Sequence, residues 1–300
     1  MPDLQTRILN IGSLNIDEVF SVDHFVGPGE TIACRSFARH AGGKGNNQSV
    51  ALARAGSAVS HAGKVGVDGR FLVEGLAAAG VDVSRVVEAG VPTGRAVIQV
   101  EDSGQNCIIL LGGANREMGR ADIDGFLEGW GPGDAVLLQN ETGEVGYALA
   151  QAALKGLEIF FNPSPIRENI AGLPLREVDW LILNEVEGAA IAGLPARAPA
   201  PPEAILAALR AGLPRTDLVL TLGADGVRYS GADGRSLSLP ALRVEAVDTT
   251  AAGDTFTGYF IAAVLRGEDV EAALREAVRA AAICVTRPGA VPSIPLRSEL

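Results

Sequence analysis

The sequence predicts an α/β fold in which a doubly wound, mostly parallel sheet is flanked by helices. The first observation is a set of short apolar runs typical of buried parallel strands, at residues 135–139, 157–162, 180–183 and 218–222. The second is that helical stretches separate these runs, at residues 145–155, 187–192 and 203–211. The third is the composition of the 300-residue chain, 47% hydrophobic and 20% charged, which suits one large globular domain.

Two other stretches interrupt this alternation of strands and helices. Residues 20–39 alternate polar and apolar side chains around a turn at positions 27–31, and residues 93–111 do so around Ser103-Gly104. Each stretch therefore predicts two short strands joined by a turn. We expect them to form a small β-sheet inserted into a single α/β domain of residues 1–300, at about 17–39 and 93–111.

The composition argues against several classes of protein. A net charge of −11 and a pI near 4.8 disfavour a surface for nucleic acids, which would show clustered basic residues. The three cysteines are odd in number and widely spaced, and they form no metal-ligand pattern with the three histidines. This cysteine usage predicts a reducing environment such as the cytoplasm.

Neither export nor membrane insertion is expected from the sequence. The chain begins Met-Pro-Asp-Leu-Gln-Thr-Arg, without the basic region and apolar core of a signal peptide. The longest strongly apolar helical stretch, residues 259–265, is too short to span a bilayer. We therefore predict a cytoplasmic protein with neither a nucleic-acid nor a membrane partner.

The first apolar run, residues 7–12, ends in a glycine and predicts a buried strand of the parallel sheet. Asn15 and Asp17 follow it, where the carboxyl end of the strand would open into a crevice. Asparagine and aspartate also form turns, so these two residues fit a polar turn as well as a binding site.

A glycine-rich run, Gly42-Gly-Lys-Gly-Asn-Asn47, precedes a helix predicted at residues 48–56. Its glycines would let a ligand approach the backbone closely. The run is not a Walker A loop, because the lysine is followed by glycine rather than by serine or threonine, and the earlier glycine of that motif is missing. Lys44 fits a solvated lysine, but a cation is disfavoured beside the positive start of a helix, which favours a ligand-binding role.

The stretch from residue 247 to residue 260 joins a turn of small residues to an apolar helix. Ala251, Ala252 and Gly253 have almost no side chain, so their amides can face an anion such as phosphate at the helix start. Asp254 lies in the same turn, where phosphate would repel it unless it took a proton from an attacking hydroxyl. A helix-capping role for Asp254 fits the local sequence equally well.

These two runs together resemble the two signatures of the ribokinase-like (PfkB) sugar kinases. The N-terminal signature matches residues 42–47, and the C-terminal signature, Asp-Thr-x-x-Ala/Gly-Gly-Asp, matches residues 248–254. The resemblance covers nearly the whole chain. It implies a ribokinase-like fold whose small β-sheet is a lid over the sugar. It also implies transfer of the γ-phosphate of ATP to a primary hydroxyl, with D-ribose as the acceptor and ribose 5-phosphate as the product.

The resemblance also implies roles for individual residues. Asp254 would be the general base, beside an anion hole formed by Ala251, Ala252, Gly253 and Asp254. The sugar would be held by Asn15, Asp17, Gly43, Lys44, Asn47 and Glu141. ATP would be held by Asn184, Thr221, Gly223, Gly226 and Gly253. Without the resemblance, Glu141 would be interpreted as a surface acid.

Two cations are implied in the same way. Mg²⁺ would lie near Asn184 and Glu187, a pair that local sequence alone would assign to a helix cap. K⁺, as a monovalent activator, would lie in a loop formed by Asp248, Thr250, Cys284, Arg287, Gly289 and Ser293. The lid implies a homodimer, by analogy with the family.

Other functions stay open at this point. Fructokinases, nucleoside kinases and 2-keto-3-deoxygluconate kinases share both signatures, and a nucleoside kinase would need an apolar slot to which Phe20 and Phe25 could contribute. A non-catalytic sugar-binding regulator fits less well, because Asp254 is intact. A dinucleotide-binding dehydrogenase is disfavoured, because no Gly-x-Gly-x-x-Gly follows the first strand.

Overall fold

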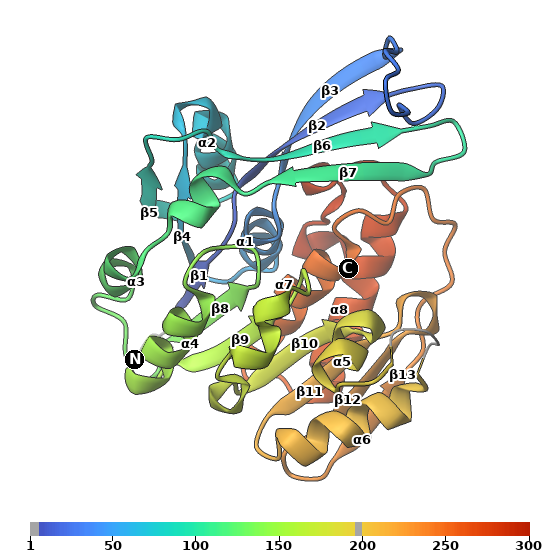
Figure 1. Ribbon diagram of the computed structural model, residues 1–300. Coiled ribbons are helices and arrows are strands. Elements are labelled where there is room, and N and C mark those ends of the chain that lie inside the picture. The colour runs from blue at the N-terminus through green and yellow to red at the C-terminus, as the bar shows by residue number, and fades with distance from the viewer. Residues whose placement is uncertain (1–5, 196–199) are drawn as a thin grey trace.

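The computed structural model describes residues 6–195 and 200–300, and it shows a doubly wound α/β fold (Figure 1). Within those residues one large sheet has the strand order β13-β12-β11-β10-β9-β8-β1-β4-β5. The strands from β11 to β5 run parallel, whereas β12 and β13 pair antiparallel at one edge. The Pro/Ala composition of residues 196–202 predicts a surface loop, and this stretch lies largely outside the described residues. The strands are β1 (Ile8–Ile11), β4 (Val59–Val65), β5 (Asp82–Glu88), β8 (Ala135–Gln139), β9 (Glu158–Asn162), β10 (Trp180–Asn184), β11 (Asp217–Thr221), β12 (Val227–Ser230) and β13 (Ser236–Leu239).

Both faces of the sheet are covered by helices, which explains the nearly continuous apolar sequence of its central strands. In β10, Ile182 belongs to the core on one face, and Leu181 and Leu183 belong to the core on the other. Helices α1, α2, α7 and α8 pack on the first face, and α3, α4, α5 and α6 on the second. The helices are α1 (Lys44–Arg54), α2 (Arg70–Ala78), α3 (Arg120–Phe126), α4 (Val145–Leu154), α5 (Glu185–Ile191), α6 (Pro202–Gly212), α7 (Ala252–Leu265) and α8 (Val270–Val285). Among the described residues, no helix has the length and apolar composition needed to cross a bilayer.

A second sheet, which we call the lid, projects from the large sheet at the top of Figure 1. Its strand order is β3-β2-β6-β7, with β2 (Asn15–Ser21), β3 (Ser36–Gly42), β6 (Gly94–Val100) and β7 (Asn106–Leu111). The two predicted antiparallel pieces are therefore confirmed. Because side chains alternate along a strand, Asp17 and Val19 face one side of the lid, and Ile16 and Phe20 face the other.

The starts of two elements differ from the prediction, and two strands were missed. Strand β2 begins at Asn15 rather than near residue 20, because the chain continues almost directly from β1 into the lid. Helix α1 begins at Lys44 rather than at residue 48, because the glycine-rich run itself forms the first helical turn. Strands β12 and β13 were not predicted, because short, partly exposed edge strands such as Ser-Leu-Ser-Leu carry no long apolar run.

Helices α1 and α7 approach each other very closely. A Cβ atom at Gly258 of α7 would overlap the Cβ of Ala51 and would lie 2.9 Å from the amide nitrogen of Leu52, both in α1. Only glycine allows this approach, because close-packed interiors leave no room for a further methyl group. The packing brings the N-terminal turn of α7, with Asp254, against Asn47 in α1.

Replacement of Gly258 by alanine should lower the free energy of unfolding by about 1–3 kcal/mol, because the added methyl group would overpack the α1–α7 contact. Gly75 is a matched control, since it lies in α2 with no other part of the protein within 4 Å of the position of a Cβ. Gly75→Ala should instead raise the free energy of unfolding by about 0.5–1 kcal/mol. Urea unfolding followed by circular dichroism measures both changes. Equal effects of the two substitutions would contradict the close contact.

Candidate active site

Polar side chains meet at the carboxyl edge of the central strands. Gln139, the last residue of β8, lies beside Asn162, the last residue of β9. Asn184 at the end of β10 lies beside Thr221 at the end of β11 in the same way. Open α/β sheets bind their ligands at this edge, so the residues that follow these strands form the candidate site.

Asp254 lies buried in the first turn of α7, with its carboxylate turned towards α1. Asn47 Nδ2 donates a hydrogen bond to Asp254 Oδ2 over 3.0 Å, and Gln48 Nε2 donates one to Oδ1 over 2.8 Å. The N-cap residue of α7, Ala251, makes no side-chain capping hydrogen bond. The contacts of Asp254 are therefore those of a residue held in a site and not those of a helix cap.

The start of α7 presents unpaired backbone amides. Ala251 adopts a left-handed conformation with φ of 60°, and the amide of Ala252 is partly engaged by the carbonyl of Thr249 at 3.3 Å. In the described part of the chain, the amides of Gly253 and Asp254 have no protein acceptor. A Cβ at Gly253 would meet nothing within 4 Å. These two amides face open space at the positive end of a helix, which suits an anion.

Lys44 lies beside the same turn, at the start of α1. It lines a cavity of about 250 Å³ together with Asn184, Gly253 and Asp254. Burial alone would lower the pKa of Lys44, but the carboxylates of Asp254, Glu141 and Glu187 outweigh it and raise the pKa above its ordinary value. Lys44 therefore stays charged and adds a positive charge to the cavity.

Glu141, directly after β8, is buried and holds the start of α1. Its Oε2 accepts hydrogen bonds from the hydroxyl of Ser13 and, over 3.1 Å, from the amide of Lys44. A carboxylate at the N-terminus of a helix satisfies free amides and interacts well with the helix dipole. Glu141, for which the resemblance implies a sugar contact, therefore caps α1 in the structure.

Asn15 and Asp17 enter the site from the first strand of the lid. Asn115 Nδ2 donates to Asn15 Oδ1 over 2.8 Å, which orients the Asn15 side chain. Asp17 is half-buried against Gly42, where a Cβ would overlap its carboxylate. Burial, together with the nearby carboxylates of Glu141 and Asp254, raises the pKa of Asp17 to about 7.

Gly43 supplies the tight turn between the lid and α1. Its φ is 92°, a left-handed value, and a Cβ there would lie 2.9 Å from the amide nitrogen of Asn15. Any other residue would be strained and would push the lid strand away from the helix. The predicted sugar-contacting residues thus lie together around one turn, with Asn47 reaching Asp254 directly.

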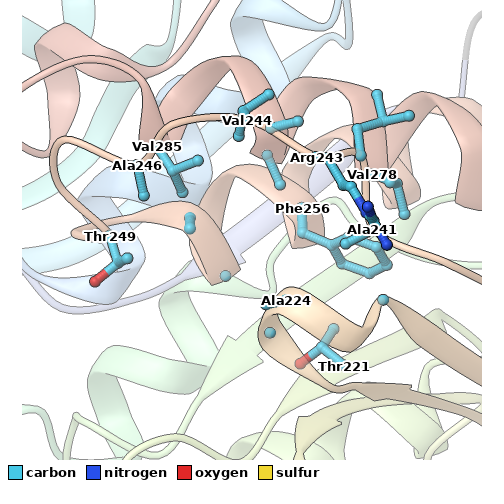
Figure 2. A pocket seen from close by; sticks show the side chains of 17 residues that line it. Thr221, Ala224, Ala241, Arg243, Val244, Ala246, Thr249, Phe256, Val278 and Val285 are labelled. Carbon is cyan, nitrogen blue, oxygen red and sulfur yellow. The ribbon is translucent and has the colours of Figure 1, made fainter.

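A larger cavity of about 680 Å³ adjoins the first one, and both are lined by Thr221, Ala252 and Gly253. Figure 2 shows its two walls: Val244, Val278 and Phe256 on one side, and Thr221 and Ala224 opposite them. The predicted ATP-binding residues Gly223 and Gly226 also line it. A mostly apolar cavity that ends at free amides suits a nucleotide, with its base in the large cavity and its phosphates at α7.

Asn184 and Glu187 form a reciprocal cap at the start of α5. Asn184 Oδ1 accepts from the amide of Glu187, and Glu187 Oε2 accepts from the amide of Asn184, both over 2.9 Å. Both residues line the smaller cavity. The two residues therefore do cap α5. They also line the cavity, and their side-chain oxygens keep lone pairs that the capping bonds do not use.

The residues implied for K⁺ come together around Asp248. The amides of Thr250 and Gly289 donate to its carboxylate over 2.9 Å and 2.8 Å. Cys284 links the loop to Ser293 over 3.1 Å and to the carbonyl of Thr250 over 3.7 Å. The side chain of Arg287 is turned away to Glu299. Its backbone amide donates to the carbonyl of Cys284.

Burial alone would raise the pKa of Asp248, but the hydrogen bonds from Thr250 and Gly289 outweigh it and lower the pKa below its ordinary value. Its hydrogen-bond donors are neutral amides and a hydroxyl. A carboxylate held in its charged form by neutral groups suits a bound cation.

Sequence reasoning missed several residues of the site. Gln139 and Asn162 are buried amides at strand ends, and Gln48 directly follows the N-terminal signature. Gln139 and Asn162 could have been predicted, because each is a polar residue at the end of an apolar run. Arg243, which lines the large cavity from an exposed loop, had no signal in the sequence.

The chain is similar to sugar kinases over nearly its whole length. Residues 5–297 match a family described as pfkB family carbohydrate kinase. Ribokinase from Haemophilus influenzae is 35% identical over 299 residues, which cover 96% of this chain and 95% of the relative. Ribokinase from Arabidopsis thaliana, solved with ribose and ATP, is 29% identical with a TM-score of 0.87, covering 98% of this chain and 97% of that one. Ribokinase from Cryptococcus neoformans, solved with ADP, is 34% identical with a TM-score of 0.83, covering 98% of both chains.

The raised pKa of Asp17 should make stability depend on pH. Between its ordinary value of 3.8 and about 7, the folded protein holds a proton that the unfolded chain releases, so stability falls as the pH rises and levels off above pH 7. Asp17→Asn removes this effect, while other groups titrate alike in both proteins. The free energy of unfolding of the variant relative to the native protein should therefore increase from about pH 4 to pH 7. Urea unfolding across this range measures it, with Asp23→Asn as an exposed control, and a constant difference would contradict the shift.

Proposed function

The chain belongs to the pfkB family of carbohydrate kinases, and we propose that it transfers the γ-phosphate of ATP to the primary hydroxyl of D-ribose, yielding ribose 5-phosphate. The observation that carries this proposal is the environment of Asp254. Its carboxylate is held by two side-chain amides beside free backbone amides and a charged lysine. Phosphate would repel a carboxylate at this position. A carboxylate that takes the proton of an attacking hydroxyl has a function that outweighs this repulsion.

In this mechanism Asp254 accepts the proton of the primary hydroxyl as the hydroxyl oxygen attacks the γ-phosphorus. The bond from the γ-phosphorus to the oxygen that bridges it to the β-phosphate breaks, and ADP leaves with that oxygen. The amides of Gly253 and Asp254 and the ammonium of Lys44 stabilise the negative charge on the transferring group. No covalent intermediate with the protein is needed.

Asn184 and Glu187 fit a hydrated Mg²⁺ ion that accompanies ATP. Their backbone cap occupies one oxygen of each side chain, and no three His, Cys, Asp or Glu side chains of the described chain gather as a metal site. Mg²⁺ keeps several waters and accepts such contacts through them. When bound, it would neutralise charge on the phosphates.

A K⁺ ion fits the loop around Asp248. The carboxylate has neutral hydrogen-bond partners, and the loop also contains the carbonyl of Thr250 and the buried hydroxyl of Ser293. A cation there would be next to the turn that leads into the free amides of α7. We propose that it stabilises this turn.

D-Ribose as the acceptor is supported by the polar residues around Gly43. The amide of Asn15 and the carboxylates of Asp17 and Glu141 offer several acceptors and donors to a polyhydroxylated sugar. The similar Arabidopsis thaliana protein was solved with ribose and ATP.

A nucleoside acceptor is less well supported. Phe20 packs against Phe37, with ring centroids 5.0 Å apart and the rings tilted by 45°, on the face of the lid opposite to Asp17. The aromatic pair is therefore turned away from the polar residues of the acceptor site and is not placed to hold a base there.

We also propose that two chains associate through their lids. All six residues of β7 are exposed, and Ile109 and Leu111 share one face with Phe37. Contiguous exposed apolar side chains on an edge strand are typical of interaction surfaces. A second copy of the chain would cover them.

Release of ADP should be selective for ribose and should depend on Asp254. In the presence of Mg-ATP and K⁺, turnover with ribose should exceed turnover with fructose, 2-keto-3-deoxygluconate and adenosine. Asp254→Asn should lower kcat with ribose by roughly a hundredfold or more, as expected for loss of a general base, with little change in sugar binding. Asp124→Asn is an exposed control. Preference for another acceptor would keep the mechanism and change the substrate, and near-normal turnover of Asp254→Asn would refute the mechanism.

The lid association should be broken by charge on β7. Ile109→Lys should convert a dimer into a monomer of 30.9 kDa, because a buried lysine without a partner strongly disfavours an interface. Leu154→Lys, at an exposed apolar position on α4, is the control and should leave the dimer intact. Sedimentation velocity measures both variants. A native protein that sediments as a monomer at micromolar concentration would rule out the proposal.

A further inference from the structure

A chain of buried hydrogen bonds runs from Asp254 into the centre of the sheet. Gln48 Nε2 donates to Asp254 Oδ1 over 2.8 Å, and Gln139 Nε2 donates to Gln48 Oε1 over 2.8 Å. Gln139 Nε2 also donates to Asn10 Oδ1 over 2.9 Å. Asn10 Nδ2 then donates to Ser49, whose hydroxyl contacts the imidazole of His61, each over 2.8 Å. The side chains that lie behind Asp254 are therefore Gln48, Gln139, Asn10, Ser49 and His61, all fully buried.

The orientation of these amides can be derived from a backbone carbonyl. Asn10 Nδ2 donates to the carbonyl of Gly45 over 2.8 Å, and a carbonyl can only accept. The other end of the Asn10 amide, Oδ1, must therefore face Gln139, which has to present its NH₂ group. The same NH₂ group then donates to Gln48 Oε1, so Gln48 points its own NH₂ group towards Asp254.

A second backbone carbonyl fixes the orientation from the other side. Asn162 Nδ2 donates to the carbonyl of Ile182 over 2.9 Å. Asn162 must therefore present Oδ1 to Gln48, whose Nε2 donates to it over 3.0 Å. Two independent anchors, one in α1 and one in β10, thus require the same orientation of Gln48. Neither anchor involves Asp254, so the donor is directed at the carboxylate before any ligand binds.

The far end of the chain is consistent with this direction. Burial lowers the pKa of His61 to about 4, although the nearby carbonyl of Gly12 opposes that effect, so the imidazole is neutral near pH 7. Ser49 accepts from Asn10 and can therefore donate its hydroxyl proton to His61 Nδ1. The network contains a single charge, that of Asp254, and its neutral dipoles are aligned towards it.

We infer that Gln48 is a positioning residue of the reaction, which holds Asp254 in the orientation that accepts the proton of the sugar hydroxyl. The inference rests on the proposed function. Gln48 has a different task from Asn47, which also bonds Asp254 but lies in the predicted sugar-contacting set. Gln48 is fully buried behind the carboxylate, so its side chain is not exposed to the cavity where a substrate would bind. It holds Oδ1 and leaves a free lone pair on each carboxylate oxygen for the incoming proton.

The network also has an energetic cost that a purely structural role does not explain. Gln139 Oε1 is buried without a hydrogen-bond partner. A buried polar atom without a partner destabilises the folded state. An apolar cluster would fill the same space without this cost, whereas only an oriented amide supplies a directed donor to Asp254.

The test separates turnover from binding. Gln48→Met keeps the length of the side chain and removes the donor, so kcat should fall roughly 10-fold to 100-fold while the KM for sugar and for ATP changes less than about threefold. Gln139→Met leaves Gln48 in contact with Asp254 and Asn162 but removes one of the two bonds that set its orientation, so kcat should fall by a smaller factor of about 3 to 10. Gln151→Met in α4 is the matched control and should keep the native kcat. If Gln48→Met does not fold, Gln139→Met alone decides the question by the same criterion.

The outcomes distinguish this inference from the proposed function. The acceptor used is whichever sugar the native protein phosphorylates, so an error in the ribose assignment does not affect the test. Native kcat in Gln48→Met or in Gln139→Met, with Asp254→Asn inactive, would overturn the inference and leave the proposed base in place. A rise in KM equal to the loss in kcat would also overturn it, because that pattern indicates general damage to the site. Native kcat in Asp254→Asn would overturn the proposed mechanism and the inference together.

Discussion

The hydrogen bonds between α1 and Asp254 of α7 are the contacts on which the rest of the site depends. Asn47 and Gln48 hold both carboxylate oxygens, and they can do so because Gly258 lets the two helices pack without an intervening side chain. The same packing places Lys44 beside the free amides of α7. The lid strand, the large cavity and the loop around Asp248 each reach the site from a different side. They form one site only because the two helix starts meet.

Much of the fold could be predicted from the sequence because its central strands and helices have the periodicity that burial requires. Strand β10 is apolar at Leu181, Ile182 and Leu183 because both of its faces are covered. Strands β12 and β13 lack that pattern, because only alternate residues of β12 and only Leu239 of β13 are buried. The start of α1 was placed too late, since glycine disfavours helices in general and only the contact of Glu141 with the Lys44 amide explains a helix there.

The site was predictable where its residues belong to the two signatures and not where they act through the fold. Asp254 could be singled out because an acid is unusual in a turn that suits phosphate. Lys44 could be singled out because a cation is unusual at the positive start of a helix. Gln139 and Asn162 are ordinary polar residues until the sheet register places them side by side. The double contact of Glu141 has no local signal either, because its partners Ser13 and Lys44 are distant in sequence. These roles depend on contacts between residues that are distant in the sequence, and such contacts cannot be predicted from local patterns in a single sequence.

The separation of Asn47 and Asp254 by 207 positions has a consequence for biosynthesis. A ribosome releases α1 and the lid early, and it releases α7 only after the strands from β8 to β13. Contacts between such distant segments carry a large loss of chain entropy and form late in folding. A nascent chain that still lacks α7 has neither the Asp254 carboxylate nor the free amides of Gly253 and Asp254. The candidate site is therefore incomplete until synthesis of the chain is almost finished, because α1 supplies the hydrogen-bond donors of Asn47 and Gln48 but not their acceptor.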